Sequence, residues 1–201
     1  MKFCCLFGED VNYLLKLAGP DIRYFAPLMK YVLYLLALGL PLLLAGAASP
    51  TAARPTVVYL VRHGEKDLTP GLADPLLTPA GEARARALAD KLAGKHPAAL
   101  FTTDTRRTRA TLAPLAAATG LVPQLYAARE PAALAAHLAQ DYAGQTVVVV
   151  GHSNTLLPLL AALGAKPEFT EIPESKFDYL FWVTLRPGHP AKLKVGRYGA
   201  R

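Results

Sequence analysis

Two segments of the chain are almost continuously apolar and rich in β-branched residues, and a histidine follows closely after each. Residues 56–61 read TVVYLV and residues 145–150 read QTVVVV, a composition typical of strands buried on both faces of a parallel sheet. Shorter apolar segments alternate with segments whose apolar residues recur at helical spacing. The pattern predicts strands over residues 56–61, 98–102, 122–126, 145–150, 179–185 and 191–198, and helices over residues 79–94, 104–119, 131–140 and 155–163. Because strands alternate with helices, we expect an α/β fold with three α/β/α layers and a mostly parallel central sheet.

Capping and turn residues support several of these boundaries. Thr78 has the side chain of a helix N-cap, and Pro79 suits the first helical position that follows it. Gly120 suits the end of the second helix. Residues 67–77 hold two prolines, a glycine and two aspartates, which predicts a loop.

The N-terminal part of the chain has a different composition. Residues 31–44 (YVLYLLALGLPLLL) form an apolar run that Lys30 precedes and the small residues 45–49 (AGAAS) follow. A basic start, an apolar stretch and an Ala-x-Ala site are typical of a secretory signal. The run is also shorter than the roughly 20 residues that a membrane-spanning helix needs. We therefore expect residues 29–48 to be a signal peptide, with an uncleaved membrane anchor as the alternative.

The expected signal divides the chain into segments. Residues 1–28 form a mixed polar stretch that secretory signals do not normally carry, so we interpret them as a start-site artefact, with the true start at Met29. Residues 49–55 (SPTAARP) are expected to be a linker, and residues 56–201 the single folded domain. An exported domain would be periplasmic or secreted, with the membrane as a partner only through an uncleaved anchor.

Composition narrows the chemistry that the domain can perform. Both cysteines, Cys4 and Cys5, lie ahead of it, so no disulfide, cysteine-based metal site or cysteine nucleophile is expected. The chain carries 22 lysines and arginines against 15 aspartates and glutamates, a net charge of +7. That charge favours an anionic substrate. Lysine clusters with interleaved aromatics are missing, so no nucleic-acid partner is expected.

The two apolar strands deliver candidate catalytic residues to one edge of the predicted sheet. His63 follows the first strand and His152 the second, and Arg62 adjoins His63. Ligand sites in open α/β sheets lie outside the carboxyl ends of the strands. A neutral imidazole nitrogen can attack phosphorus to form a phosphohistidine, and arginine stabilises the charged phosphoryl oxygens. This chemistry requires no metal, and we expect no cofactor.

Four sequence blocks, in order, carry a resemblance to a known family. They are residues 62–65 (RHGE), 74–82 (DPLLTPAGE), 103–111 (TDTRRTRAT) and 151–154 (GHSN). Together they resemble the histidine phosphatase superfamily, which has the phosphoglycerate mutase-like fold, over roughly residues 56–185.

The resemblance implies a role for each matching residue. His63 would be the nucleophile, and Arg62 and His152 would hold the phosphoryl group. Matching Thr103 and Thr111 to the family's block makes Arg107 the further phosphate-binding arginine.

The proton donor is left open by the sequence. The longer members of the family have a Gly-Trp-Glu-like segment that this chain lacks, and Glu130 falls at a comparable distance after the arginine block. A carboxylate there also suits the start of a helix, where the helix dipole stabilises it. Glu65 and Asp178 are the other candidates for the general acid.

Three polar residues beside the histidines are candidates for substrate binding. They are Ser153, Asn154 and Glu65. Asn154 could equally cap the helix that begins beside it. Ser153 is not expected to be a nucleophile, because the Gly-x-Ser-x-Gly elbow of the α/β-hydrolases is missing.

The expected function is hydrolysis of a small phosphorylated substrate by a compact, exported bacterial member of the family, acting on an exported or envelope phosphate monoester. A phosphohistidine or phosphoprotein phosphatase is the alternative within the family. A catalytically silent envelope module that binds phosphate or glycolipid is the alternative from another class. Specificity is expected in residues 67–77, 127–135 and 164–177. The sequence leaves the substrate and the oligomeric state undetermined.

Overall fold

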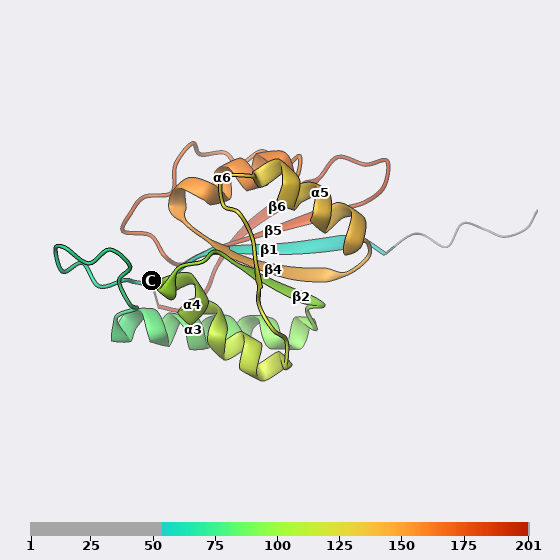
Figure 1. The fold of residues 1–201 in the computed structure, drawn as a ribbon. Coiled ribbons are helices and arrows are strands. Elements are labelled where there is room, and N and C mark those ends of the chain that lie inside the picture. The colour runs from blue at the N-terminus through green and yellow to red at the C-terminus, as the bar shows by residue number, and fades with distance from the viewer. Residues whose placement is uncertain (1–53, 201) are drawn as a thin grey trace, which may run out of the picture. The chain divides into compact units, whose positions relative to one another are not determined.

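A computed structural model describes residues 54–200, which form an α/β domain around a six-stranded mixed sheet (Figure 1). The strand order is β3-β2-β4-β1-β5-β6. The pairs from β3 to β1 are parallel, and β5 is antiparallel to both of its neighbours. Five strands therefore run one way and β5 runs the other, which confirms the expected mostly parallel sheet.

The elements follow one another in the predicted order. The strands are β1 (Thr56–Arg62), β2 (Ala99–Thr102), β3 (Gln124–Leu125), β4 (Thr146–Gly151), β5 (Tyr179–Leu185) and β6 (Lys192–Arg197). The helices are α3 (Pro79–Leu92), α4 (Arg106–Thr119), α5 (Pro131–Asp141), α6 (Ser153–Ala162) and a short 3-10 turn, η2 (Ala93–Lys95).

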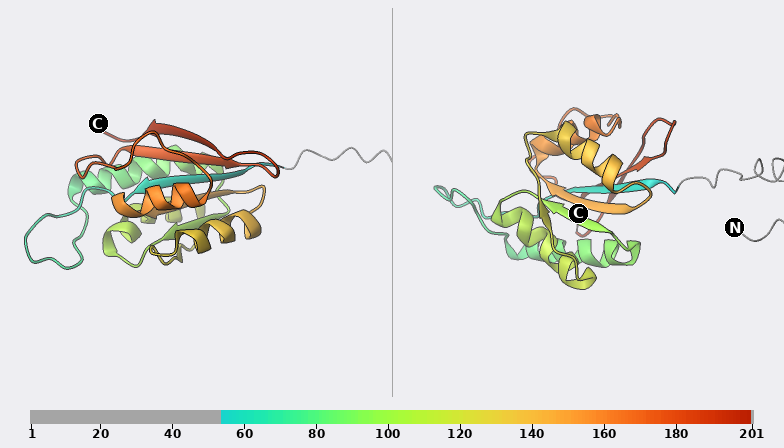
Figure 2. Two further views of the ribbon diagram at one scale, coloured as in Figure 1. Left: turned by 90° about the horizontal axis from the view of Figure 1, so that it is seen from above. Right: turned by 45° about the vertical axis from the view of Figure 1, so that its right-hand side comes forward.

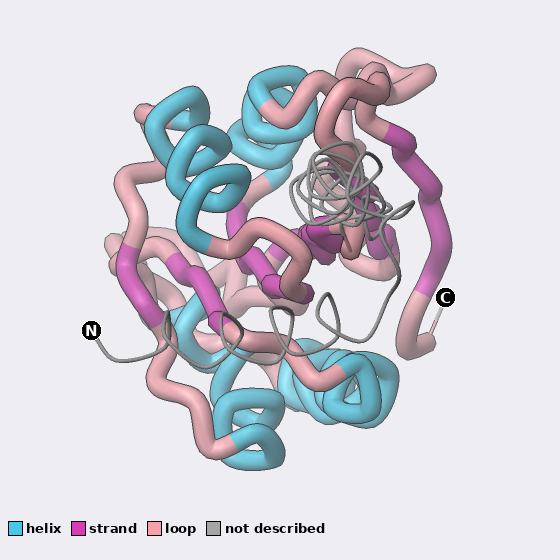
Figure 3. The backbone as a smooth tube through the Cα atoms, turned by 90° about the vertical axis from the view of Figure 1, so that its right-hand side faces the viewer, coloured by secondary structure: helices cyan, strands magenta, loops and turns pink. Residues whose placement is uncertain are grey.

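Helices cover both faces of the sheet, so the predicted three-layer arrangement is correct. Helices α3 and α4 lie on one face, and α5 and α6 lie on the other (Figure 1). A view along the strands shows the sheet between the two helical layers (Figure 3). None of the helices within residues 54–200 has the length and hydropathy needed to cross a membrane.

The two strongly apolar strands lie side by side at the centre of the sheet. β1 and β4 pair in parallel from Val57 opposite Thr146 to Arg62 opposite Gly151. All four valines of β4 are fully buried. Strands covered on both faces lose the polar alternation of half-exposed strands, which is why both segments appear in the sequence as apolar runs.

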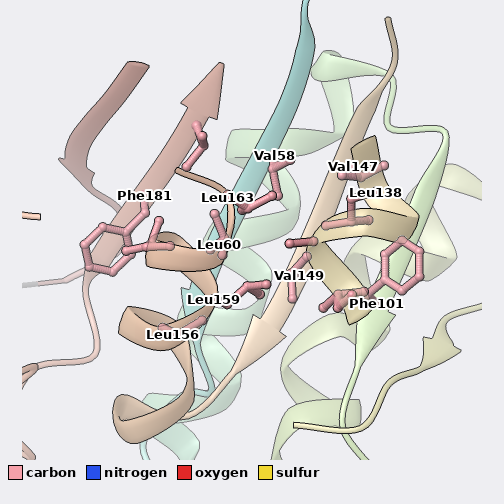
Figure 4. Packing of buried hydrophobic residues seen from close by; sticks show 14 of the residues in the cluster. Val58, Leu60, Phe101, Leu138, Val147, Val149, Leu156, Leu159, Leu163 and Phe181 are labelled. Carbon is pink, nitrogen blue, oxygen red and sulfur yellow. The ribbon is translucent and has the colours of Figure 1, made fainter. Parts of the chain in front are cut away.

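Each face of the sheet has its own hydrophobic core. Leu60 and Val149 point to the face covered by α5 and α6, where they pack with Leu159 and Phe181 (Figure 4). The opposite core is built by alternate strand residues together with leucines of α3 and α4: Val61, Val148, Val150, Leu88, Leu92, Leu112 and Leu115.

Most predicted boundaries agree with the structure to within one or two residues. Thr78 is the N-cap of α3 and its hydroxyl accepts a hydrogen bond from the Gly81 N–H, while Gly120 ends α4 with a φ of 71°. The strand predicted over residues 122–126 is the two-residue edge strand β3. The predicted artefact, signal peptide and linker lie in residues 1–53, outside the described residues, except for the last two linker positions.

Two glycines allow the loop after β1 to pack against the start of α3. A Cβ on Gly81 would lie 2.3 Å from the carbonyl oxygen of Glu65, and a Cβ on Gly64 would lie 2.8 Å from that of Gly81. The Gly64 N–H donates to the Thr111 hydroxyl of α4 at 2.9 Å. The contact fixes the backbone immediately after His63 against two helices.

We predict that Gly81→Ala destabilises the domain although alanine is the better helix former. The new methyl group would overlap the Glu65 backbone, and such overpacking costs about 1–3 kcal/mol. Denaturant titration of the full chain measures the free energy of unfolding. Gly94→Ala is the matched control, because a Cβ there meets no atom within 4 Å. Equal stability of both variants would contradict the close approach.

Candidate active site

The central strand pair brings the two motif histidines together. His63 directly follows β1 and its backbone N–H donates to the carbonyl of Gly151 at 3.0 Å. The rings of His63 and His152 meet edge to face with their centroids 5.4 Å apart. Gly151, which precedes His152, lets the Tyr126 side chain pack against the end of β4, because a Cβ there would lie 2.7 Å from the Tyr126 hydroxyl.

His63 is held in the form that a nucleophile needs. Its Nδ1 lies 2.7 Å from the carbonyl oxygen of Gly64, and since a carbonyl can only accept, Nδ1 carries the proton. The Nε2 lone pair is therefore free. The pKa of His63 is lowered to about 3, chiefly by burial and in addition by the positive charges of Arg62 and Arg107, against the opposing Gly64 hydrogen bond. The imidazole is neutral at neutral pH.

His152 is oriented by a chain of hydroxyl groups. Its Nδ1 lies 3.5 Å from Nη2 of Arg107, which can only donate, so Nε2 carries the proton and donates to the Thr103 hydroxyl at 2.9 Å. The Thr103 hydroxyl lies 3.0 Å from that of Thr108. Burial, followed by Arg107 and Arg62, lowers the pKa of His152 to about 4. A bound phosphate would oppose these effects, because an anion favours the protonated ring.

Arg62 is the most deeply buried charge of the site, with 2 % of its surface exposed. Its Nη1 donates to backbone carbonyls in the loop before β5, and its Nη2 donates to the carboxylate of Glu174 at 2.5 Å. The ring of Phe177 lies 4.3 Å from the guanidinium carbon and also faces His63. The buried Nε of Arg62 has no hydrogen-bond partner within the described part of the chain.

Among the three clustered arginines, the structure places Arg107 with the histidines, as predicted. Besides His152 it contacts Asp74, with Nη1 3.3 Å from Oδ1, and none of the described residues is a hydrogen-bond partner for its buried Nε. Arg109 instead pairs with Asp104 and is half exposed. Arg106 at the start of α4 donates its backbone N–H to Asp74.

The comparisons with known proteins agree with this geometry. The model of the histidine phosphatase superfamily (branch 1) matches residues 58–129, a range that includes His63 and Arg107. The match covers part of the domain and agrees with the resemblance that the four sequence blocks carry to the same superfamily. No curated protein matches the sequence.

Solved structures of the superfamily's fold are similar to the domain at low sequence identity. A mycobacterial glucosyl-3-phosphoglycerate phosphatase has a TM-score of 0.57 at 18% identity, covering 74% of this chain and 100% of its own. The protein histidine phosphatase SixA, complexed with tungstate, has a TM-score of 0.57 at 19% identity, covering 70% and 96%. A phosphoserine phosphatase from Entamoeba histolytica has a TM-score of 0.55 at 17% identity, covering 73% and 98%. At these identities the likeness establishes the fold.

Glu65 forms an ion pair with Arg84, whereas it was expected to be a candidate proton donor or substrate ligand. Both of its oxygens accept from Arg84, at 2.6 to 3.0 Å. Arg84 is buried and also donates to the carbonyls of Tyr198 and Ala200, so the pair ties the loop after β1 to the end of the chain. Burial is the largest single influence on the pKa of Glu65 and raises it. The other influences, chiefly the hydrogen bonds and charge of Arg84, outweigh burial, so the pKa is lowered overall.

The structure does not bring the other two proton-donor candidates to the histidines. Glu130 is exposed at the start of α5 and lines a small pocket of about 200 Å³, which contains neither His63 nor His152. It follows β3, which is three strand positions from β1 and thus about 14 Å across the sheet. Asp178 is buried in a pair with Arg197, 2.7 Å away.

The residues after His152 have distinct surroundings. Ser153 is the first residue of α6 and donates its hydroxyl to Glu174 at 2.6 Å, which places it beside Arg62. Asn154 is exposed and is not the helix cap. His152 is the N-cap, and its N–H donates to the Thr155 hydroxyl.

Three residues that contact the arginines of the site were not predicted as site residues from the sequence: Asp74, Glu174 and Phe177. They come from two of the loops in which specificity was expected, residues 67–77 and 164–177. Asp74 belongs to one of the four blocks, but nothing in a one-dimensional pattern indicates that its carboxylate reaches Arg107. Within residues 54–200, no three His, Cys, Asp or Glu side chains are grouped as a metal site requires.

We predict that the buried neutral His63 makes stability depend on pH. The unfolded chain protonates this histidine near pH 6.5, whereas the folded chain resists protonation down to about pH 3. Unfolding is therefore favoured as the pH falls below 6.5, and His63 alone should cost about 2 kcal/mol between pH 7 and pH 5.

Denaturant unfolding at the two pH values checks this prediction. The loss should shrink in His63→Gln by about that amount and stay unchanged in His189→Gln, whose side chain is exposed. An identical loss in all three proteins would show that His63 titrates normally.

Proposed function

We propose that this domain hydrolyses phosphate monoesters through a phosphohistidine on Nε2 of His63. The observation that carries the proposal is the unprotonated Nε2 of a buried neutral imidazole, beside two arginines that each keep one buried Nε–H without a partner among residues 54–200. Buried unpaired donors are costly. A phosphoryl group, with three acceptor oxygens, is the chemistry that suits them.

The reaction has two steps. The Nε2 lone pair forms a bond to phosphorus while the bond from phosphorus to the ester oxygen breaks, and that oxygen takes up a proton as the alcohol leaves. Arg62 and Arg107 offset the charge on the equatorial oxygens. Water then attacks the phosphohistidine, the N–P bond breaks, and inorganic phosphate and neutral His63 are released.

His152 would assist by orientation and charge. Its Nδ1 side faces Arg107, and a phosphoryl group between them would raise the pKa of the ring toward protonation. A protonated His152 would add a second donor to the transferring group. The hydroxyls of Thr103 and Thr108 hold the ring in place during this change.

The substrate is proposed from chemistry and from the N-terminal sequence. The expected signal over residues 29–48 would export the domain to the periplasm or outside the cell, where a phosphorylated envelope or exported molecule would be the substrate. The similar solved structures include phosphatases named for a sugar phosphate ester, a phosphoamino acid and a phosphorylated protein histidine. A phosphohistidine phosphatase is the alternative that the likeness to SixA supports.

The first test is hydrolysis of p-nitrophenyl phosphate by the full chain. We expect turnover that orthovanadate inhibits, and we expect His63→Ala to abolish it with the fold retained by circular dichroism. Acid-labile, base-stable labelling by a radioactive phosphate ester should be trapped on wild type and lost in His63→Ala. Phosphate binding without any turnover would instead favour a silent binding module, and wild-type activity in His63→Ala would exclude the proposed nucleophile.

A second prediction separates the clustered arginines. Arg107→Ala should lower kcat/KM by about 10²–10³-fold, the usual effect of removing one donor to the developing charge. Arg109→Ala is the matched control, since its guanidinium pairs with Asp104 on the surface. Its kcat/KM should stay within about twofold of wild type. Equal losses in the two variants would count against a specific role for Arg107.

A further inference from the structure

The five residues 173–177, which we call the strap, lie over Arg62. The carbonyl oxygens of Pro173, Glu174 and Lys176 accept from Nη1 at 3.2, 2.9 and 3.4 Å. Phe177 covers the face of the same guanidinium. The strap belongs to the connection between α6 and β5, so its only covalent ties to the sheet lie at its two ends.

The side chain of Glu174 occupies the remaining terminal nitrogen of Arg62. Its Oε2 accepts from Nη2 at 2.5 Å, and its Oε1 accepts from the Ser153 hydroxyl at 2.6 Å. The planar guanidinium offers its donors to a carboxylate and to a phosphate in the same forked geometry. A phosphoryl group that binds Arg62 in this forked geometry, through the buried Nε–H and Nη2, must compete with Glu174 for Nη2.

The burial of the nucleophile also indicates that a group must move before a substrate binds. His63 has 3 % of its surface exposed and Arg62 has 2 %, so little of either group is open to a substrate in the arrangement described. Glu174, by contrast, is 74 % exposed while its two oxygens are bound. It reaches the site from solvent and can return to solvent, and a phosphoryl group that replaces it would then offset the buried charge of Arg62.

We propose that Glu174 is an internal competitor of the substrate: its carboxylate takes the place of a phosphoryl group on Arg62 and Ser153, and the arriving phosphate displaces it. The inference rests on the proposed function, because it assumes that Arg62 binds the phosphoryl group. It makes Glu174 a determinant of substrate affinity.

Electrostatics and geometry support displacement rather than shared binding. The Ser153 hydrogen bond lowers the pKa of Glu174, and Arg62 lowers it further, so the carboxylate is ionised at neutral pH and repels a phosphate dianion beside it. Arg62 is buried but Glu174 is largely exposed, so water screens this ion pair and solvates the carboxylate when it leaves. The Glu174 carboxylate is therefore held well enough to fill the site and loosely enough to leave it.

Asp74 on Arg107 does not have the same freedom. Both of its oxygens also accept the backbone N–H of Arg106 at the start of α4, at 2.9 and 3.2 Å. Its contact with Arg107 is the longer one, at 3.3 Å. Asp74 is thus anchored to the helix, and we expect it to keep its place when phosphate binds.

Calorimetric titration of the full chain with inorganic phosphate tests the proposal. Glu174→Gln removes the charge and keeps the size of the side chain, and Glu174→Ala removes the side chain. Both should bind phosphate more tightly than wild type, by a factor on the order of five, the scale of one exposed ion pair. Glu171→Gln is the matched control, because it removes the same charge from an exposed position of the same connection and should leave the affinity unchanged.

The possible outcomes separate the inference from the proposed function. Unchanged or weaker phosphate binding in both Glu174 variants would overturn the inference and make Glu174 a support for Arg62. An equal gain in Glu171→Gln would also overturn it, because net charge alone would explain the effect. Turnover of p-nitrophenyl phosphate, measured on the same proteins, tests the proposed function separately, since wild type can hydrolyse the ester whether or not Glu174 competes.

Discussion

The parallel pairing of β1 with β4 is the interaction on which the rest of the site depends. It aligns Arg62 with Gly151, so the residues that follow the two strands start from adjacent positions at the same edge of the sheet. A shift of one residue in this register would turn one histidine away from the other, because successive side chains of a strand point to opposite faces. The apolar runs that are buried on both sides of the sheet hold the register in place.

Burial at this edge has two opposing effects on the chemistry. It keeps His63 and His152 neutral, which preserves a lone pair for attack, and it removes Arg62 from water, which makes its positive charge more effective toward a phosphoryl group. That buried positive charge must be compensated by groups of the protein itself. The carbonyls of the strap and the carboxylate of Glu174 provide this compensation.

The loops that surround the histidines divide into fixed and movable parts. The loop after β1 is fixed by the Gly64–Gly81 approach and by the pair between Glu65 and Arg84. The strap contacts the site through hydrogen bonds to a single guanidinium and through one exposed carboxylate. Substrate binding is accordingly expected to change the strap and to leave the β1 loop as it is.

The sequence by itself determined the order of strands and helices, the three layers, and the positions of His63, Arg62 and His152 at strand ends. These features follow from periodicity and from local motifs, which are properties of neighbouring residues. The boundaries of Thr78 and Gly120 were predictable for the same reason. Arg107 could be chosen from its neighbours only through a family resemblance.

Only the tertiary structure decided which carboxylates reach the site. Glu130 was chosen by its distance after the arginine block, and in the structure it is exposed at the start of α5, beside a pocket that contains neither His63 nor His152. Glu65 lies close to His63 in the sequence, yet both of its oxygens accept hydrogen bonds from the buried Arg84. Glu174 lies 112 residues from Arg62 along the chain, and it meets Arg62 because β5 runs antiparallel beside β1. Contacts of this kind depend on which strands are neighbours, and no local pattern in the sequence encodes that order.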